Sequence, residues 1–221
     1  MLKSPFTDLD ERIKAFAQAD IYPVISSEFC NGRHPLEVLR GVVSAGVKVV
    51  QLREKNLCKN KIYELGIEYR KITAEHGVLL IINDHTDVAL ALNADGVHLG
   101  QEDLPLVAAK QIAPQLLFGV STHDPHEASD AVRDGAGYIN IGPIYPTSTK
   151  HVSCGAVGIK MLKSIAPGLS IPFSVMGGIK AQHIPELLAA GARQIAMVTE
   201  ITKADDVMKK TMELLRSLFR K

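Results

Sequence analysis

The chain has 221 residues, of which 46% are hydrophobic and 22% charged, and its formal net charge is +1. This composition supplies one sizeable core, and the absence of a basic arm or stripe argues against nucleic acid as a partner. No apolar run approaches the roughly 18 residues that a membrane helix needs, so we expect no membrane partner. Three cysteines without CxxC spacing indicate reduced thiols in a cytoplasmic protein.

The predicted elements begin with residues 1–20, which we interpret as an N-terminal helical extension that lacks the apolar core of a signal peptide. Eight short β-rich runs then alternate with longer segments of helical periodicity. In chain order the predicted strands are 21–26, 47–53, 78–84, 96–100, 117–121, 138–142, 172–178 and 194–199. The clearest helical segments are 35–46, 60–77, 181–192 and 204–220. Residues 143–156 predict a long loop in place of a helix.

This alternation favours a parallel sheet, and eight units of this length favour a closed (β/α)8 TIM barrel over an open doubly wound sheet. Because no Ser/Gly-rich or Pro-rich linker divides the chain, we expect residues 1–221 to form a single barrel domain. In such barrels the active site lies at the carboxyl ends of the strands. Polar residues at those ends are therefore the candidates for chemistry.

The second predicted strand ends in a polar row. Alternation along the strand places Gln51, Arg53 and Lys55 on one face, inside the barrel mouth. Val50 and Leu52 then lie on the other face, under the helices. Buried cations are costly unless an anion meets them, so the row predicts either an anionic ligand or an internal salt-bridge network.

Further polar residues end the next three strands. Asn83 and Asp84 end the third, and Asp103 lies just beyond the fourth. Oxygen ligands beside cations suit Mg²⁺. The alternatives are ordinary turn chemistry for Asn83 and Asp84, and an N-cap role for Asp103 in the following helix. Ser121 and His123 end the fifth strand, and the histidine is either a general base or a hydrogen-bonded structural residue.

The loop GPIYPTSTKH follows the sixth strand. The hydroxyls of Thr147 and Thr149 and the ammonium of Lys150 suit phosphate oxygens, with a solvated surface turn as the alternative. The two glycines of VMGGI end the seventh strand and permit close approach of the backbone to a ligand. Loops after strands seven and eight often bind phosphate in such barrels. The sequence therefore predicts a cationic anion site near strand two and a backbone anion site near strands seven and eight.

The motifs QLREK, INDH, DGVHLGQEDLP, GVSTH, GPIYPTSTK, GGI and AMVTEI occur in this order. Together they resemble the thiamine phosphate synthase family, also called thiamine-phosphate pyrophosphorylases, over nearly the whole chain. The resemblance implies a (β/α)8 barrel transferase of thiamine biosynthesis that uses Mg²⁺. The implied reaction joins hydroxymethylpyrimidine diphosphate to a thiazole phosphate, which gives thiamine monophosphate and pyrophosphate. Members of the family are often dimers, so a homodimer is also implied.

The resemblance implies a role for each matching residue. The implied contacts to the pyrimidine diphosphate are Gln51, Arg53, Lys55, Asn83, Ser121 and Lys150. The implied thiazole phosphate site consists of Thr147, Thr149, Gly178 and the backbone around Val198 and Thr199. The implied Mg²⁺ ligands are Asp84 and Asp103, and the implied catalytic residues are Arg53, Lys55, Ser121 and Lys150.

Two other functions stay open. Thiazole tautomerases resemble the synthases and use a histidine after strand five, where His123 stands, but they generally lack the full diphosphate-binding set. A phosphate-binding protein without turnover would not need Asp84 or Lys150. The chain departs from the family pattern at His151, where a basic residue is common, and at Cys154.

Overall fold

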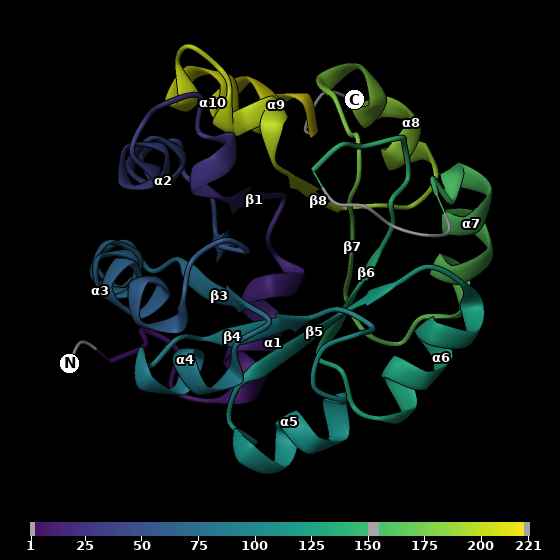
Figure 1. Cartoon of the computed structure of the whole chain (residues 1–221). Helices are drawn as coiled ribbons and strands as arrows, with labels where there is room; N and C mark the ends of the chain where they lie inside the picture. The colour runs from purple at the N-terminus through teal and green to yellow at the C-terminus, as the bar shows by residue number, and fades with distance from the viewer. Residues whose placement is uncertain (1–2, 150–154, 219–221) are drawn as a thin grey trace.

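The computed structural model describes residues 3–149 and 155–218, and within them the predicted TIM barrel is confirmed. Its eight parallel strands pair in sequence order, and β1 pairs with β8 to close the barrel. In Figure 1 the helices surround the ring of strands. The strands are β1 (Ile21–Ile25), β2 (Val49–Leu52), β3 (Leu79–Asn83), β4 (Gly96–Leu99), β5 (Leu117–Thr122), β6 (Tyr138–Ile141), β7 (Phe173–Val175) and β8 (Gln194–Met197).

The helices fill the segments between the strands. They are α1 (Leu9–Ala17), α2 (Pro35–Ser44), α3 (Lys59–Glu75), α4 (Thr86–Ala91), α5 (Leu106–Ile112), α6 (Pro125–Arg133), α7 (Gly158–Ile165), α8 (Ile184–Ala189), α9 (Thr199–Thr202) and α10 (Val207–Leu218). The described residues also contain the 3₁₀ turns η1 (Ser27–Phe29), η2 (Ala166–Gly168) and η3 (Ala181–His183). The segment predicted as one helix over 181–192 divides into η3 and α8, with Pro185 in the first turn of α8, where its missing N–H is tolerated. The described residues of the long loop 143–156 contain no helix, as predicted.

Two apolar layers hold the barrel together. The outer layer lies between strands and helices and includes Val50 and Leu52. The inner layer fills the barrel with inward side chains such as Val49 and Leu79. This division follows from the alternation of side chains along each strand.

Helix α1 closes the amino-terminal end of the barrel and lies within the predicted extension, residues 1–20. Its Phe16 is fully buried and stacks on Tyr138 of β6, with ring centroids 3.9 Å apart. Gln194 at the start of β8 donates to the carbonyl of Ala17 at 2.8 Å. In Figure 1, α1 lies behind β4 and β5, at the end of the barrel opposite the mouth.

A buried ion pair stabilises the same end. Arg70 of α3 and Asp95, just before β4, are 2.9 Å apart, and their side chains are 3% and 0% exposed. Asp95 also accepts hydrogen bonds from the Leu80 N–H, at 2.7 Å, and from the Ser4 hydroxyl. These partners stabilise the charged carboxylate. Removing its charge would leave the positive charge of Arg70 buried without a counter-charge.

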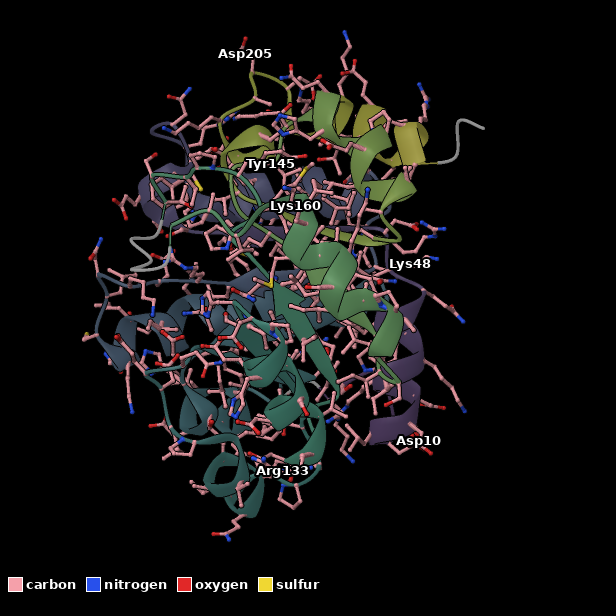
Figure 2. All side chains as sticks on the ribbon, turned by 90° about the vertical axis from the view of Figure 1, so that its right-hand side faces the viewer. Asp10, Lys48, Arg133, Tyr145, Lys160 and Asp205 are labelled. Atoms are coloured by element: carbon pink, nitrogen blue, oxygen red, sulfur yellow. The ribbon has the colours of Figure 1, made fainter. Side chains whose placement is uncertain are left out.

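Charged side chains cover the outside of the barrel, as Asp10, Lys48, Arg133 and Asp205 show in Figure 2. Among residues 3–149 and 155–218, the helices are too short or too polar to span a bilayer.

The Tyr138 ring needs the space left by a glycine on the neighbouring strand, which generates a stability prediction. A β-carbon at Gly119 would lie 2.0 Å from Tyr138 Cζ, whereas one at Gly168 would meet nothing within 4 Å. We expect Gly119→Ala to lower the free energy of unfolding by about 1–3 kcal/mol through overpacking. Gly168→Ala is the matched control and should be near neutral. Urea denaturation of both variants measures the difference, and equal stability would contradict this account of the barrel interior.

Candidate active site

The polar row on β2 points into the barrel mouth, meaning the carboxyl ends of the strands. Gln51 is 1% exposed, and its Nε2 donates to the Tyr22 hydroxyl at 2.8 Å. Val50 and Leu52 pack in the outer layer instead. The predicted assignment of the two faces is therefore confirmed at these positions.

A chain of hydrogen bonds crosses the barrel interior from Gln51 to Ser121. The hydroxyls of Tyr22 and Tyr138 are 3.1 Å apart, and His98 Nδ1 lies 3.1 Å from the Tyr138 hydroxyl. His98 Nε2 then lies 2.9 Å from Ser121 Oγ. Burial is the main cause that raises the pKa of both tyrosines, so both hydroxyls stay protonated at neutral pH.

The sequence analysis missed Tyr22, His98 and Tyr138. The available signal was strand alternation, because each of them lies at an inward position of β1, β4 or β6. We call this set, from Gln51 through Tyr22, Tyr138 and His98 to Ser121, the interior chain.

Arg53 follows Gln51 at the mouth and is half-buried. Its guanidinium makes no hydrogen bond or ion pair with residues 3–149 or 155–218, although burial lowers its pKa and Asp84 raises it by a smaller amount. Lys55, in contrast, pairs with Asp84. The salt-bridge alternative therefore accounts for Lys55 but leaves Arg53 available for an anion.

Asp84 and Asp103 lie together, as predicted for the ends of neighbouring strands. Burial raises the pKa of Asp84 most, and the adjacent carboxyl of Asp103 raises it further, against the lowering effect of Lys55. Asp103 Oδ2 accepts from the Gly100 N–H at 2.6 Å, while Pro105 occupies the N-cap position of α5. The N-cap alternative for Asp103 is therefore wrong, because the helix begins beyond its reach.

Turn chemistry does account for part of the Asp84 geometry. Asp84 has a φ of 63°, in the left-handed region that aspartate tolerates better than most residues. Its N–H donates to the His98 carbonyl at 2.9 Å, which ties the turn to β4. Asn83 precedes it, is 8% exposed and pairs with His98 across the sheet.

The donor set around Asp84 and Asp103 fits a hard divalent cation. The Asp103 carboxyl helps to raise the pKa of Asp84, and Asp103 itself is held in place by the Gly100 N–H. Within residues 3–149 and 155–218 no group of three or more His, Cys, Asp or Glu side chains is arranged as a metal site. The pair would thus leave most of a coordination sphere to other oxygen donors.

A small cavity of about 50 Å³ collects further predicted residues, with Ser121, Thr147 and Thr149 in its wall. The rest of its lining is His123, Asn140, Gly142, Pro143, Met176 and Gly177. The hydroxyls of Thr147 and Thr149 lie 3.0 Å apart. Of the hydroxyl residues 147–149, Ser148 is exposed while Thr147 and Thr149 are half-buried, so the surface-turn alternative applies to Ser148 alone.

His123 is oriented by a carboxylate. Its Nδ1 lies 2.7 Å from Glu127 Oε2, and the same oxygen accepts from the His123 backbone N–H at 2.7 Å. Because a carboxylate only accepts, Nδ1 carries the proton in this arrangement. The histidine is thus hydrogen-bonded, as the structural alternative requires, and also lines the cavity.

The loops after β6 and β7 interlock. The N–H groups of Ile144 and Tyr145 donate to the carbonyls of Met176 and Gly177, at 2.8 and 2.9 Å. Gly178 has a φ of 62°, and a β-carbon on it would lie 2.3 Å from the Pro146 carbonyl oxygen. The glycines thus admit a loop of the protein itself, and their approach to a ligand stays a prediction.

The remaining predicted residues lie at the end of β8 or outside the described ranges. Val198 and Thr199 are half-buried directly after β8, and Val198 packs against the inner layer. Lys150, with His151 and Cys154, lies outside the described residues, so its predicted role is untested.

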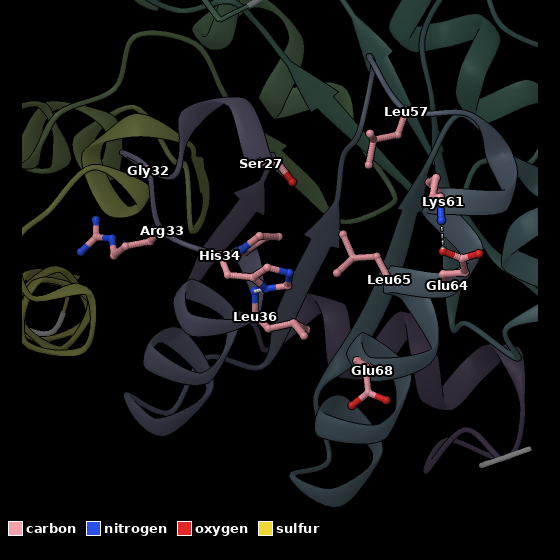
Figure 3. A pocket seen from close by; sticks show the side chains of 11 residues that line it. Ser27, Gly32, Arg33, His34, Leu36, Leu57, Lys61, Glu64, Leu65 and Glu68 are labelled. Atoms are coloured by element: carbon pink, nitrogen blue, oxygen red, sulfur yellow. Dashed lines mark hydrogen bonds and ion pairs between the residues drawn. The ribbon is translucent and has the colours of Figure 1, made fainter.

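A larger groove, of about 670 Å³, lies between the segment that leads into α2 and the first turns of α3 (Figure 3). Its lining includes His34, Leu57 and Leu65, and Lys61 pairs with Glu64 at its edge. None of the predicted site residues lines this groove.

Comparisons with known proteins agree with the motifs. The family model described as thiamine monophosphate synthase matches residues 21–201. A thiamine-phosphate synthase of Pelotomaculum thermopropionicum is 40% identical over 210 residues, which is 95% of this chain and 96% of the relative. One of Shouchella clausii is 39% identical over 90% of this chain and 95% of its own. The solved structure of a thiamine phosphate pyrophosphorylase from Pyrococcus furiosus aligns with a TM-score of 0.85 and 33% identity, over 92% of this chain and 96% of that one.

Asp84 at the mouth and the buried Asp95 should respond oppositely to neutralisation. The folded protein holds the pKa of Asp84 above its ordinary value, so ionising this carboxyl costs the folded state free energy as the pH rises through the ordinary pKa. We expect Asp84→Asn to raise the unfolding midpoint at pH 7, and the gain to vanish below pH about 3.9. Asp95→Asn should instead cost about 3–5 kcal/mol, because Arg70 loses its partner. Thermal unfolding across pH tests both, and a midpoint lowered in Asp84→Asn at pH 7 would contradict the assignment.

Proposed function

The chain belongs to the thiamine monophosphate synthase family, whose members are transferases that form thiamine monophosphate, and from this premise we propose its substrates and residue roles. The substrates are hydroxymethylpyrimidine diphosphate and a thiazole phosphate, and the second product is inorganic pyrophosphate. The observation that carries this proposal is the cluster at the ends of β2, β3 and β4. There Arg53, which has no ion-pair partner in the part of the chain that the structure describes, lies near the Lys55–Asp84 pair and Asp103.

A diphosphate suits this cluster better than a monophosphate does. Its leaving group carries several negative charges, and Arg53 and Lys55 supply cations for them. A carboxylate pair would repel such an anion unless a metal ion lay between them, so the acids and the cations serve one ligand together. A protein that binds only a monophosphate would gain nothing from Asp84 and Asp103.

We propose that Asp84 and Asp103 hold Mg²⁺. When bound, the ion would neutralise charge on the departing diphosphate. The two aspartates supply its protein ligands, and Lys55, which pairs with Asp84 in this structure, supplies a neighbouring cation. The ligand role of the two aspartates and the cation role of Lys55 use side chains that the fold already holds at the mouth.

The reaction breaks the bond between the pyrimidine methylene carbon and the diphosphate oxygen, which keeps the electron pair. The thiazole nitrogen then donates its lone pair to that carbon, and a C–N bond forms. No proton leaves carbon, so the site needs charge stabilisation rather than a strong base. Arg53, Lys55 and Lys150 stabilise the leaving group, and Ser121 contacts its diphosphate end.

The interior chain supports the pyrimidine end of this site. Gln51 and Asn83 contact the pyrimidine diphosphate in our proposal, and the Tyr22 hydroxyl fixes the side-chain amide of Gln51. His98, on the neighbouring strand β4, lies within hydrogen-bond distance of the Ser121 hydroxyl on β5. The site must also keep water away from the pyrimidine cation, because water would otherwise capture it.

The thiazole phosphate binds between the loops after β6, β7 and β8 in this proposal. Thr147 and Thr149 donate hydroxyl hydrogen bonds, and the backbone around Gly178, Val198 and Thr199 supplies N–H groups. This arrangement puts the second anion across the mouth from the first.

We also propose that residues 1–221 form one barrel domain, with residues 1–20 as its helical extension. The described cysteines, Cys30 and Cys58, are free thiols, which agrees with a cytoplasmic location. A homodimer is proposed from the family alone.

Pyrophosphate release tests the proposed function. We expect release only when both substrates and Mg²⁺ are supplied. Arg53→Gln should reduce kcat by about 10²-fold or more, because it removes an unpaired cation from the leaving group. Lys59→Gln is the matched control, since Lys59 pairs with Asp87 at 2.8 Å on the exposed side of α3. No release from the wild-type protein would refute the function, and wild-type turnover in Arg53→Gln would refute the role of Arg53.

One observation favours a second candidate activity, thiazole tautomerisation. The Glu127 carboxylate orients His123 on the cavity, an arrangement that suits a general base. A synthase has no proton to remove from carbon, so His123→Gln should keep synthase turnover within about tenfold of wild type. A tautomerase that uses this base should lose about 10²- to 10⁴-fold. Both activities can be assayed on one preparation, and isomerisation abolished by His123→Gln without any pyrophosphate release would favour the tautomerase.

A further inference from the structure

The loop that carries Thr147 and Thr149 loses its backbone support at Tyr145. The Tyr145 N–H donates to the Gly177 carbonyl at 2.9 Å, and this is the last bond that joins the loop to the one after β7 within residues 142–149. Pro146 has no N–H to continue the pattern. Thr149 N–H turns back to Thr147 Oγ1, at 3.3 Å, so the two threonines bond each other rather than a scaffold. Whatever fixes Tyr145 therefore sets where the threonines lie.

The Tyr145 side chain is fixed at two points on the segment that opens α8. Its hydroxyl donates to Glu186 Oε2 at 2.9 Å. Its ring stacks on His183, with centroids 3.9 Å apart and planes inclined by 22°. His183 Nδ1 in turn accepts from the Lys180 N–H at 3.1 Å. Figure 2 labels Tyr145 in the upper half of the view, just above Lys160 of α7.

Tyr145 also touches the glycine predicted to bind phosphate. A β-carbon on Gly178 would lie 2.9 Å from both the Cβ and the carbonyl oxygen of Tyr145. One residue thus packs against Gly178 and precedes Thr147 by two positions. Burial, and then Glu186, raises the pKa of Tyr145 to about 12, so the hydroxyl remains a donor throughout the neutral range.

We propose that Tyr145 is a positioning residue for the thiazole phosphate, acting through Glu186 and His183 to hold Thr147 and Thr149 against Gly178. The proposal rests on the proposed function of the site. Tyr145 touches neither reacting atom in this account. Its effect is on the binding of one substrate, because the cationic cluster at β2 to β4 has no contact with the clamp formed by Tyr145, His183 and Glu186.

Kinetics of hydroxyl removal test the clamp. Tyr145→Phe keeps the ring stack and removes the hydroxyl. We expect KM for the thiazole phosphate to rise about 3- to 10-fold, less than the full value of a hydrogen bond to a charged acceptor, because this bond is exposed and acts on the phosphate only through the loop. KM for the pyrimidine diphosphate and the unfolding midpoint should stay at wild-type values. Tyr63→Phe, on α3, is the matched control and should change neither KM.

Substitutions at the acceptor give an independent test. Glu186→Ala should reproduce Tyr145→Phe, while Glu186→Gln keeps an acceptor oxygen and should restore most of the affinity. The double variant Tyr145→Phe with Glu186→Ala should be no worse than either single variant, because both remove the same bond. Additive losses, or equal rises in both KM values, would overturn the proposal.

A measurement without substrates separates this proposal from the proposed function. Hydrogen exchange of the Thr147 and Thr149 amides should be faster in Tyr145→Phe than in the wild type, with α3 amides unchanged. If the wild-type protein released no pyrophosphate, the function would fail, and exchange alone would decide whether the clamp exists. Unchanged exchange together with unchanged KM would overturn the clamp even in an active enzyme.

Discussion

Polar groups inside a closed barrel are shielded from water, so hydrogen bonds across the interior stabilise them, and Tyr138 takes part in two of these contacts through its hydroxyl. Its ring stacks on Phe16 from α1 and occupies the space beside Gly119, while its hydroxyl lies near both Tyr22 and His98. Tyr138 thereby contacts both α1, which closes the amino-terminal end of the barrel, and the interior chain that leads to the mouth. An interior made only of aliphatic residues would pack as densely, but it would not orient Gln51 or Ser121.

The two ends of the barrel use charge differently. At the amino-terminal end, Asp95 is matched by Arg70 and by further donors, so its charge supports the fold. At the mouth, Asp84 has a raised pKa and lies beside the Asp103 carboxyl, and the Arg53 guanidinium has no hydrogen-bond or ion-pair partner among the described residues. The fold therefore tolerates electrostatic cost at the end where a ligand can relieve it, which is a common property of active sites.

Sequence patterns predicted the barrel and much of the mouth because they depend on local rules. Alternation along β2 placed Gln51 inward and Leu52 outward, and polar residues after apolar runs marked the strand ends. The interior chain was not predicted, because Tyr22 and Tyr138 are 116 positions apart and only closure of the barrel brings their hydroxyls together. The N-cap role of Asp103 depends on where α5 begins. The N-cap position falls on Pro105, two residues beyond Asp103, and sequence patterns do not fix a helix start that closely.

The interlocked loops after β6 and β7 have a consequence for how such a pocket can change over time. Each loop fills space that the other would need for a larger residue, since Gly142 faces the Met176 carbonyl while Gly177 and Gly178 face Pro143 and Pro146. A substitution that enlarges one loop is therefore excluded until the other has moved. New ligand preferences at this side of the mouth would have to arise through paired changes in both loops, whereas the cationic side, built from separate strand ends, is open to stepwise variation.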